Sequence, residues 1–148
     1  MQNTFTYDEI VIGHEVAGPQ LTVTREAIKE FATASFDHNP LHWDDRFLEE
    51  TTFAGNKKFD DVIQHGLMTY SLMLKTMTDW LWPDNGNHRR LETRFKQPIY
   101  PGDHITVSAK VVDKRETAKG KWLTCEVTVQ KADGTIAATG EALAEILN

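Results

Sequence analysis

The sequence lacks the features that mark several large protein classes. Its 148 residues include a single cysteine, Cys125, which excludes an intrachain disulfide and a metal site built from cysteines. No segment approaches the ~20 consecutive apolar residues that a transmembrane helix needs, so we expect no membrane span. The net charge is −6 and the basic residues form no stripe, which argues against nucleic acid as a partner.

The N-terminus and the composition are those of an ordinary globular protein. The first residues, MQNTFTYDEIVIG, have no basic start and no long apolar run, so we expect no signal peptide. Charged residues make up 26%, close to the average, and large-scale disorder is therefore not expected. The length suits one domain, residues 1–148, with its own core. A reducing cytoplasm is the simplest location.

The second half of the chain predicts four strands. Apolar residues occupy every second position in four stretches that begin near Leu91, Ile105, Leu123 and Ile136. Ala132-Asp133-Gly134 is a hairpin signal between the last two. A further strand is expected over residues 14–23, interrupted at Gly18-Pro19, because proline has no N–H for a sheet ladder.

The first half predicts helices. Thr24 is suited to cap a helix over residues 25–36, and residues 44–50 suit a short one. A longer pattern runs from Val62 to Trp82 and is apolar over more than one face, as in a buried helix. Residues 51–61 show no period and are expected to form an exposed loop. A sheet that curls around one apolar helix gives an α+β fold.

Between the first two helices lies Asp37-His38-Asn39-Pro40-Leu41-His42. Asp37 and His42 are five residues apart and cannot be neighbours on one helix. Pro40 ends the helix near Asn39, and the turn that follows can bring His42 back beside Asp37. A carboxylate and an imidazole that share a water form a general acid–base site. The same residue types also make ordinary turns, with His42 as a surface or half-buried histidine.

His65-Gly66 lies near the start of the long helix. A glycine there leaves the backbone N–H groups unshielded, and with the positive end of the helix dipole they can hold a partial negative charge. Close backbone packing is the alternative explanation for Gly66. His65 is alternatively a polar residue at a helix entrance.

These motifs resemble a known family. Asp37-x-Asn39-Pro40-Leu41-His42, the later His65-Gly66-Leu67 and the turn Tyr100-Pro101-Gly102-Asp103 are similar to the MaoC-like, or R-specific enoyl-CoA hydratase, family over roughly residues 8–147. The resemblance implies a hot-dog fold, in which a curved antiparallel sheet wraps the long helix, with an extra N-terminal helix-loop overhang. It also implies a homodimer joined sheet edge to sheet edge and an acyl-CoA thioester as substrate.

Carried onto this chain, the resemblance makes Asp37 and His42 the catalytic pair. The Gly66 N–H then takes the place of the group that holds the thioester oxygen, and Asn39 and His65 are further candidates for substrate binding. Which of Asp37 and His42 is the base stays open, because two neighbouring groups can titrate as a unit. No cofactor and no metal are expected, since the pair is an incomplete ligand set.

The expected reaction is reversible, R-specific addition of water across the double bond of a 2-enoyl-CoA. Three alternatives stay open: dehydration of a 3-hydroxyacyl group on a carrier protein, thioester hydrolysis, and a non-catalytic acyl-binding subunit of a heterodimer. The chain departs from the family pattern at two places. Phe36 stands where a glycine often precedes the aspartate, and Ser71 is followed by Leu72-Met73-Leu74. The candidates for contacts with the carrier phosphates are Lys57, Lys58, Arg89, Arg90, Arg94 and Lys96.

Overall fold

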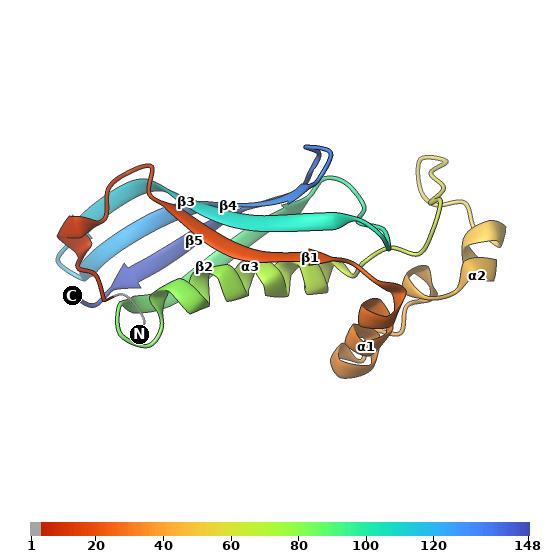
Figure 1. Ribbon diagram of the computed structural model, residues 1–148, viewed down its shortest axis with the longest axis horizontal. Helices are drawn as coiled ribbons and strands as arrows, with labels where there is room; N and C mark the ends of the chain where they lie inside the picture. The colour runs from red at the N-terminus through yellow and green to blue at the C-terminus, as the bar shows by residue number, and fades with distance from the viewer. Residues whose placement is uncertain (1–3) are drawn as a thin grey trace.

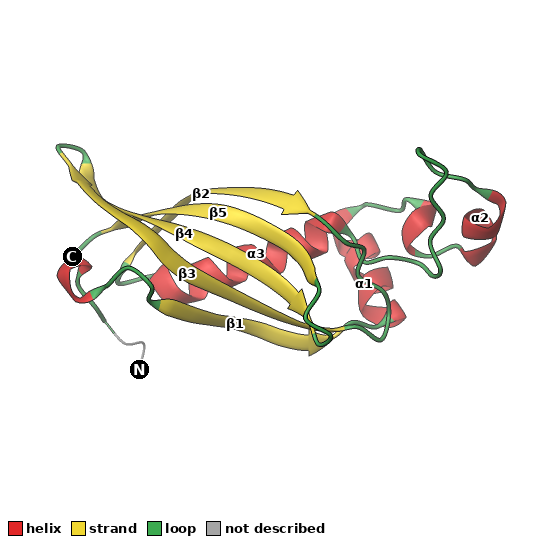
Figure 2. Cartoon of the chain, turned by 90° about the horizontal axis from the view of Figure 1, so that it is seen from above, coloured by secondary structure: helices red, strands yellow, loops and turns green. Residues whose placement is uncertain are grey.

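The computed structural model describes residues 4–148 as a five-stranded antiparallel sheet laid over one long helix (Figures 1 and 2). The strands are β1 (Glu15–Thr22), β2 (Gly86–Phe95), β3 (His104–Thr117), β4 (Gly120–Lys131) and β5 (Ile136–Ile146). Their order in the sheet is β1-β3-β4-β5-β2, so β1 and β2 are the edges. This arrangement confirms the α+β hot-dog fold. No helix within these residues is long and apolar enough to cross a membrane.

The helices fall into two groups. The long helix α3 (Gly66–Leu81) runs along the concave face of the sheet, whereas α1 (Arg25–Ser35) and α2 (Asp45–Glu50) lie beyond one end of it (Figure 1). Short 3-10 turns occur at Tyr7–Glu9 and Pro40–His42. Thr24 caps α1 as predicted, because its hydroxyl accepts from the Ala27 N–H at 3.1 Å. The expected helix-loop overhang is therefore present.

The core lies between α3 and the sheet. Met73, Met77 and Leu81 of α3 are fully buried. They belong to one cluster with inward residues of β3, β4 and β5, among them Val107, Cys125 and Ala142. Cys125 is thus the small buried core residue that the alternation predicts, and burial raises the pKa of its thiol to about 12.

Two glycines let the backbone of the sheet approach its neighbours closely. A Cβ on Gly140 of β5 would lie 2.7 Å from Met73 Cε and 2.7 Å from the Glu92 carbonyl oxygen. A Cβ on Gly18 of β1 would lie 2.2 Å from Thr76 Oγ1. The register of β1 against β3 shifts between Ala17 and Gln20, which confirms the predicted interruption at Gly18-Pro19.

Helix α3 begins later than the apolar pattern indicates. The pattern starts at Val62, but residues 62–65 are not helical, and the helix begins at Gly66. The backbone before it is used in other pairings, since the Gln64 N–H donates to the Ile99 carbonyl at 2.8 Å. Gly66 is consequently the first residue of the helix, and the segment before it lies beside the loop that carries His42.

Candidate active site

The loop from Asp37 to His42 is shaped by its own polar side chains. Phe36 ends α1 with a φ of 59°, a left-handed conformation that favours glycine, so the departure from the family pattern falls on a strained position. Asp37 Oδ1 accepts from the Asn39 N–H at 3.3 Å, and Asn39 Oδ1 accepts from the Leu41 N–H at 3.1 Å. Asn39 is exposed and shapes the turn.

His42 is held in one orientation by the segment that precedes α3. Its side chain is buried, and its Nδ1 lies 2.7 Å from the Ile63 carbonyl oxygen. A carbonyl oxygen can only accept, so Nδ1 carries the proton and donates it. In the neutral ring Nε2 is then the nitrogen with a free lone pair. It is the atom of His42 that can take a proton from a water.

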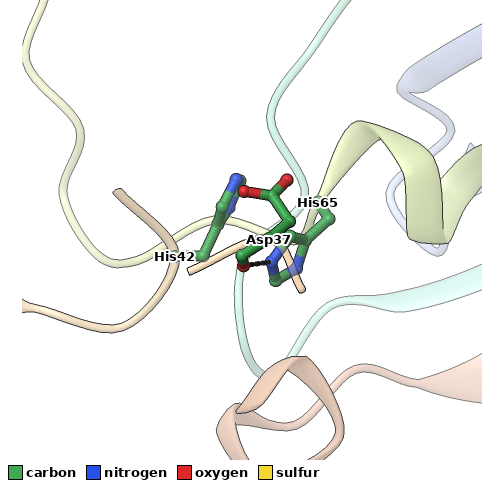
Figure 3. Close-up of side chains that lie close together, drawn as sticks. All are labelled: Asp37, His42 and His65. Carbon is green, nitrogen blue, oxygen red and sulfur yellow. Dashed lines mark hydrogen bonds between the residues drawn. The ribbon is translucent and has the colours of Figure 1, made fainter. Parts of the chain in front are cut away.

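The structure brings Asp37, His42 and His65 together (Figure 3). One polar side-chain atom of each residue lies within 4.8 Å of those of the other two. The turn at Pro40 therefore does return His42 to Asp37. His65 is fully buried and donates from Nε2 to the Asp37 main-chain carbonyl at 3.0 Å. Its ring stacks on that of His42, with ring centroids 3.8 Å apart and an interplanar angle of 23°.

His65 contacts both members of the Asp37–His42 pair. It does not line the adjoining cavity, and its contacts with the Asp37 carbonyl and the His42 ring suit a residue that positions the pair. Burial lowers the pKa of His65 below its ordinary value of 6.5, the hydrogen bond to the Asp37 carbonyl opposes this, and His42 lowers it further. Near neutral pH the ring is uncharged, which lets it stack on His42 without repulsion.

An apolar cavity of about 350 Å³ adjoins His42 and the start of α3. Its lining residues are Leu41, His42, Phe59, Ile63, Gln64, Gly66, Thr69, Phe95, Lys96, Gln97, Pro98, Ile99 and Ala137. The first N–H groups of α3 have no acceptor within the helix, and the side chain of His65 does not cap them. The helix start at Gly66 thus presents donors and the positive end of the dipole at the cavity wall.

Gly66 also leaves room for a neighbouring ring. A Cβ at this position would lie 3.2 Å from Cζ of Phe95, which is more than half exposed. The close-packing explanation and the oxyanion explanation for this glycine therefore both have support, and they do not exclude each other.

Asp37, His42 and His65 are also the described residues that most resemble a metal-ligand set. Two observations make these residues poorly suited to bind a metal ion. His42 Nδ1 and His65 Nε2 are each engaged by a carbonyl oxygen. The two rings are stacked with an interplanar angle of 23°, and a ring nitrogen binds a metal along a lone pair in its own ring plane, so the two rings are poorly placed to share one tetrahedral ion. The arrangement suits proton transfer better than ion binding.

Ser71 and the basic residues proposed to contact the carrier phosphates lie in different parts of the fold. Ser71 is exposed and donates to the Leu67 carbonyl at 2.8 Å, away from the cavity lining. Arg89 is paired with Glu145, and Arg90 with Glu141 at 3.0 Å. Lys96 lines the cavity and is exposed.

Two buried polar residues of the cavity were not predicted from the sequence. Gln64 and Thr69 are both buried, and Gln64 Nε2 donates to Thr69 Oγ1 at 2.8 Å. The only signal for Gln64 is a polar residue inside an apolar run. Its position on the wall becomes evident once the helix start is placed at Gly66.

Comparison with known proteins identifies the family of the chain. Residues 9–133 match the family model described as "MaoC like domain". The chain is 30% identical over 119 residues to the (R)-specific enoyl-CoA hydratase of Aeromonas caviae, covering 80% of this chain and 83% of that protein.

Solved structures share the fold. The monoamine oxidase regulatory protein from Archaeoglobus fulgius is 25% identical, with a TM-score of 0.78, and the match covers 100% of this chain and 99% of that one. The (R)-hydratase from A. caviae is 24% identical, with a TM-score of 0.76 over 94% and 98% of the two chains. The chain therefore belongs to the MaoC-like family, whose relatives support a hydratase or dehydratase role.

Proposed function

We propose that this protein adds water reversibly across the double bond of a 2-enoyl-CoA thioester to give the (R)-3-hydroxyacyl product. The observation that carries the proposal is that a carboxylate–imidazole pair reaches, through its imidazole, the same cavity as a helix N-terminus. Asp37 lies beside His42, His42 lines the cavity and has one open nitrogen, and the N-terminus of α3 contributes to the same cavity wall.

The pair supplies the proton transfers that hydration needs. The water oxygen bonds to C3, and one of its protons passes to the pair, where His42 Nε2 is the open acceptor. The same pair delivers a proton to C2, so it returns to its starting protonation state after each turnover. Asp37 accepts a hydrogen bond from the attacking water and balances the charge that forms on the imidazole.

The helix start stabilises the charge that develops during the reaction. Attack at C3 pushes electrons onto the thioester oxygen and gives it enolate-like charge. The N–H of Gly66 is a preorganised donor for that oxygen, and losing one such donor typically costs about 2.7–4 kcal/mol of transition-state stabilisation. The apolar cavity walls raise the strength of this interaction by excluding water.

We further propose that two copies associate along β2. This strand is an edge of the sheet, so its outer backbone groups have no strand partner within residues 4–148. Phe95 at its end is 57% exposed and Leu67 at the start of α3 is 52% exposed, which gives the edge an apolar flank. Light scattering coupled to gel filtration tests this proposal. A dimer supports it, and a monomer at micromolar concentration contradicts it.

Hydration of crotonyl-CoA, followed as loss of enoyl absorbance, tests the proposed activity. Asp37→Asn and His42→Ala should each lower the rate by orders of magnitude while the circular dichroism spectrum stays that of the wild type. His38→Ala is the matched control, because His38 is exposed in the same loop and does not line the cavity. Full activity of either Asp37→Asn or His42→Ala would contradict the assignment of the pair as catalytic.

The same assay separates the alternatives. Release of free thiol from the ester indicates a thioesterase, and activity confined to an enoyl group on a carrier protein indicates the carrier-dependent dehydratase. A chain that is inactive alone and becomes active with a second subunit indicates the heterodimer.

A further inference from the structure

Gln64 carries a polar atom that has no hydrogen-bond partner in the part of the chain that the structure describes. The side chain is only 4% exposed, although it lines the cavity. Its Nε2 donates to Thr69 Oγ1, whereas its Oε1 has no hydrogen-bond partner among residues 4–148. Buried amide groups are normally paired, so an unpaired one at a cavity wall calls for a ligand or an ordered water.

Turning the Gln64 amide does not give its second polar atom a partner. Oxygen and nitrogen of a glutamine can be exchanged by turning the amide, and Thr69 Oγ1 can accept from one or donate to the other. In either orientation one polar atom of Gln64 is paired with Thr69 and the other is not. A group that both donates and accepts, such as a hydroxyl, fits both orientations.

The burial of the lining residues tells the two ends of the cavity apart. Lys96 and Gln97 are exposed, whereas Gln64 and Thr69 are buried. The carrier part of a thioester is large and must leave through the exposed end. The acyl chain therefore extends toward the buried end, and Gln64 belongs to that end.

We propose that Gln64, held by Thr69, recognises a hydroxyl group on the acyl chain. The preferred substrate is then a short 2-enoyl thioester that bears a hydroxyl beyond its double bond. This inference rests on the proposed hydratase function and names its substrate class. The hydroxyl pairs with the free atom of the Gln64 amide, and Thr69 fixes the amide so that the pairing needs no rearrangement.

The test compares kcat/KM for unsubstituted trans-2-hexenoyl-CoA with that for the same ester bearing a hydroxyl at C4, C5 or C6. The wild type should favour one of the hydroxylated esters by about tenfold, the upper range for one net hydrogen bond. Gln64→Met keeps the length of the side chain and removes the amide, so the ratio should fall to about one. Gln20→Met is the matched control, because it removes an exposed amide on β1 that does not touch the cavity.

The outcomes separate the two proposals. If the wild type hydrates neither ester, the proposed function fails. If it hydrates both and the ratio is the same in Gln64→Met, hydroxyl recognition by Gln64 is wrong and the hydratase function stands. A wild-type preference for the unsubstituted ester also overturns the inference.

A second pair of variants keeps the inference testable if Gln64→Met does not fold. Thr69→Val removes the hydroxyl that holds the amide and should lower the preference for the hydroxylated ester. Thr69→Ser retains that hydroxyl and should restore the preference. Equal ratios of kcat/KM in these two variants contradict the proposed pairing. A merely structural role of Thr69 would change kcat/KM for the two esters by the same factor.

Discussion

The imidazole ring of His42 stacks on that of His65, with ring centroids 3.8 Å apart. Both rings are fixed by backbone carbonyls, His42 by that of Ile63 and His65 by that of Asp37. A positive charge on the His65 ring would face the His42 ring at van der Waals distance. The catalytic proposal for His42 therefore requires that His65 stay neutral while His42 takes up and releases a proton.

The first prediction concerns the pH dependence of stability. Burial lowers the pKa of His65 below 6.5 in the folded protein, so below about pH 6.5 the unfolded chain binds more protons than the folded one. The free energy of unfolding should be at its full value above pH 6.5 and should fall as the pH drops toward the folded pKa. Urea denaturation at pH 7.5 and pH 5.5 measures this difference.

His65→Phe should flatten that dependence. The variant keeps a ring against His42 but cannot bind a proton, although it also loses the bond to the Asp37 carbonyl and should be less stable at every pH. Burial also lowers the pKa of His88, so part of the pH dependence should remain. An unchanged slope in His65→Phe would show that His65 is not the group responsible.

The second prediction concerns Phe36, which adopts a φ of 59° and is 86% exposed. A left-handed conformation costs a non-glycine residue about 1–2 kcal/mol, and little packing is lost when this side chain is removed. Phe36→Gly should therefore raise the free energy of unfolding by about 1 kcal/mol, after allowing for the greater entropy of glycine in the unfolded chain.

Asn56→Gly is its matched control. Asn56 has a φ of 57°, but asparagine tolerates this region. Its replacement should therefore raise the free energy of unfolding by less than Phe36→Gly does. A loss of stability in Phe36→Gly, measured by urea denaturation, would mean that the ring is covered by another surface in solution.

The third prediction concerns the contact between β1 and α3. A Cβ on Gly18 would meet Thr76 Oγ1 at 2.2 Å and the Val107 carbonyl at 2.8 Å. Gly18→Ala should lower the free energy of unfolding by about 1–3 kcal/mol, the usual range for overpacking. In Gly18→Ala/Thr76→Ala the side-chain clash is gone and the backbone clash remains, so part of the loss should be recovered. Equal stability of the single variant and the wild type would contradict the close contact.

The fold was predictable because its signals are local and periodic. The alternation in the second half and the apolar run before Pro83 indicate four strands and one buried helix without knowledge of their pairing. The start of α3 was not predictable. Hydrophobic periodicity reports burial, and residues 62–65 are buried or half-buried through tertiary pairing with Ile99 rather than as part of a helix.

The site was predictable in part for the same reason. The spacing from Asp37 to His42 and the proline between them indicate a turn that joins the two side chains. His65 is 28 residues from Asp37, and its bond to the Asp37 carbonyl depends on where α3 is docked, so its supporting position has no local signal. The free amide atom of Gln64 depends in the same way on which residues surround it in the folded chain.

The last prediction distinguishes two possible roles of Gly66. Its N–H can act as a hydrogen-bond donor, and its lack of a side chain leaves space for a neighbour. Gly66→Pro removes the proposed donor at a position where proline is structurally acceptable, because it is the first helical residue. The preceding His65 already has a ψ of 136°, in the range that a following proline requires.

Gly66→Ala keeps the donor and adds only the Cβ that meets Phe95 at 3.2 Å, a contact that an exposed ring can relieve. If the N–H holds the thioester oxygen, Gly66→Pro should lower kcat for crotonyl-CoA by about 10²–10³-fold, and Gly66→Ala by much less. Both variants should unfold at nearly the same temperature. Equal losses of kcat would mean that Gly66 is required for space and that its N–H does not act on the substrate.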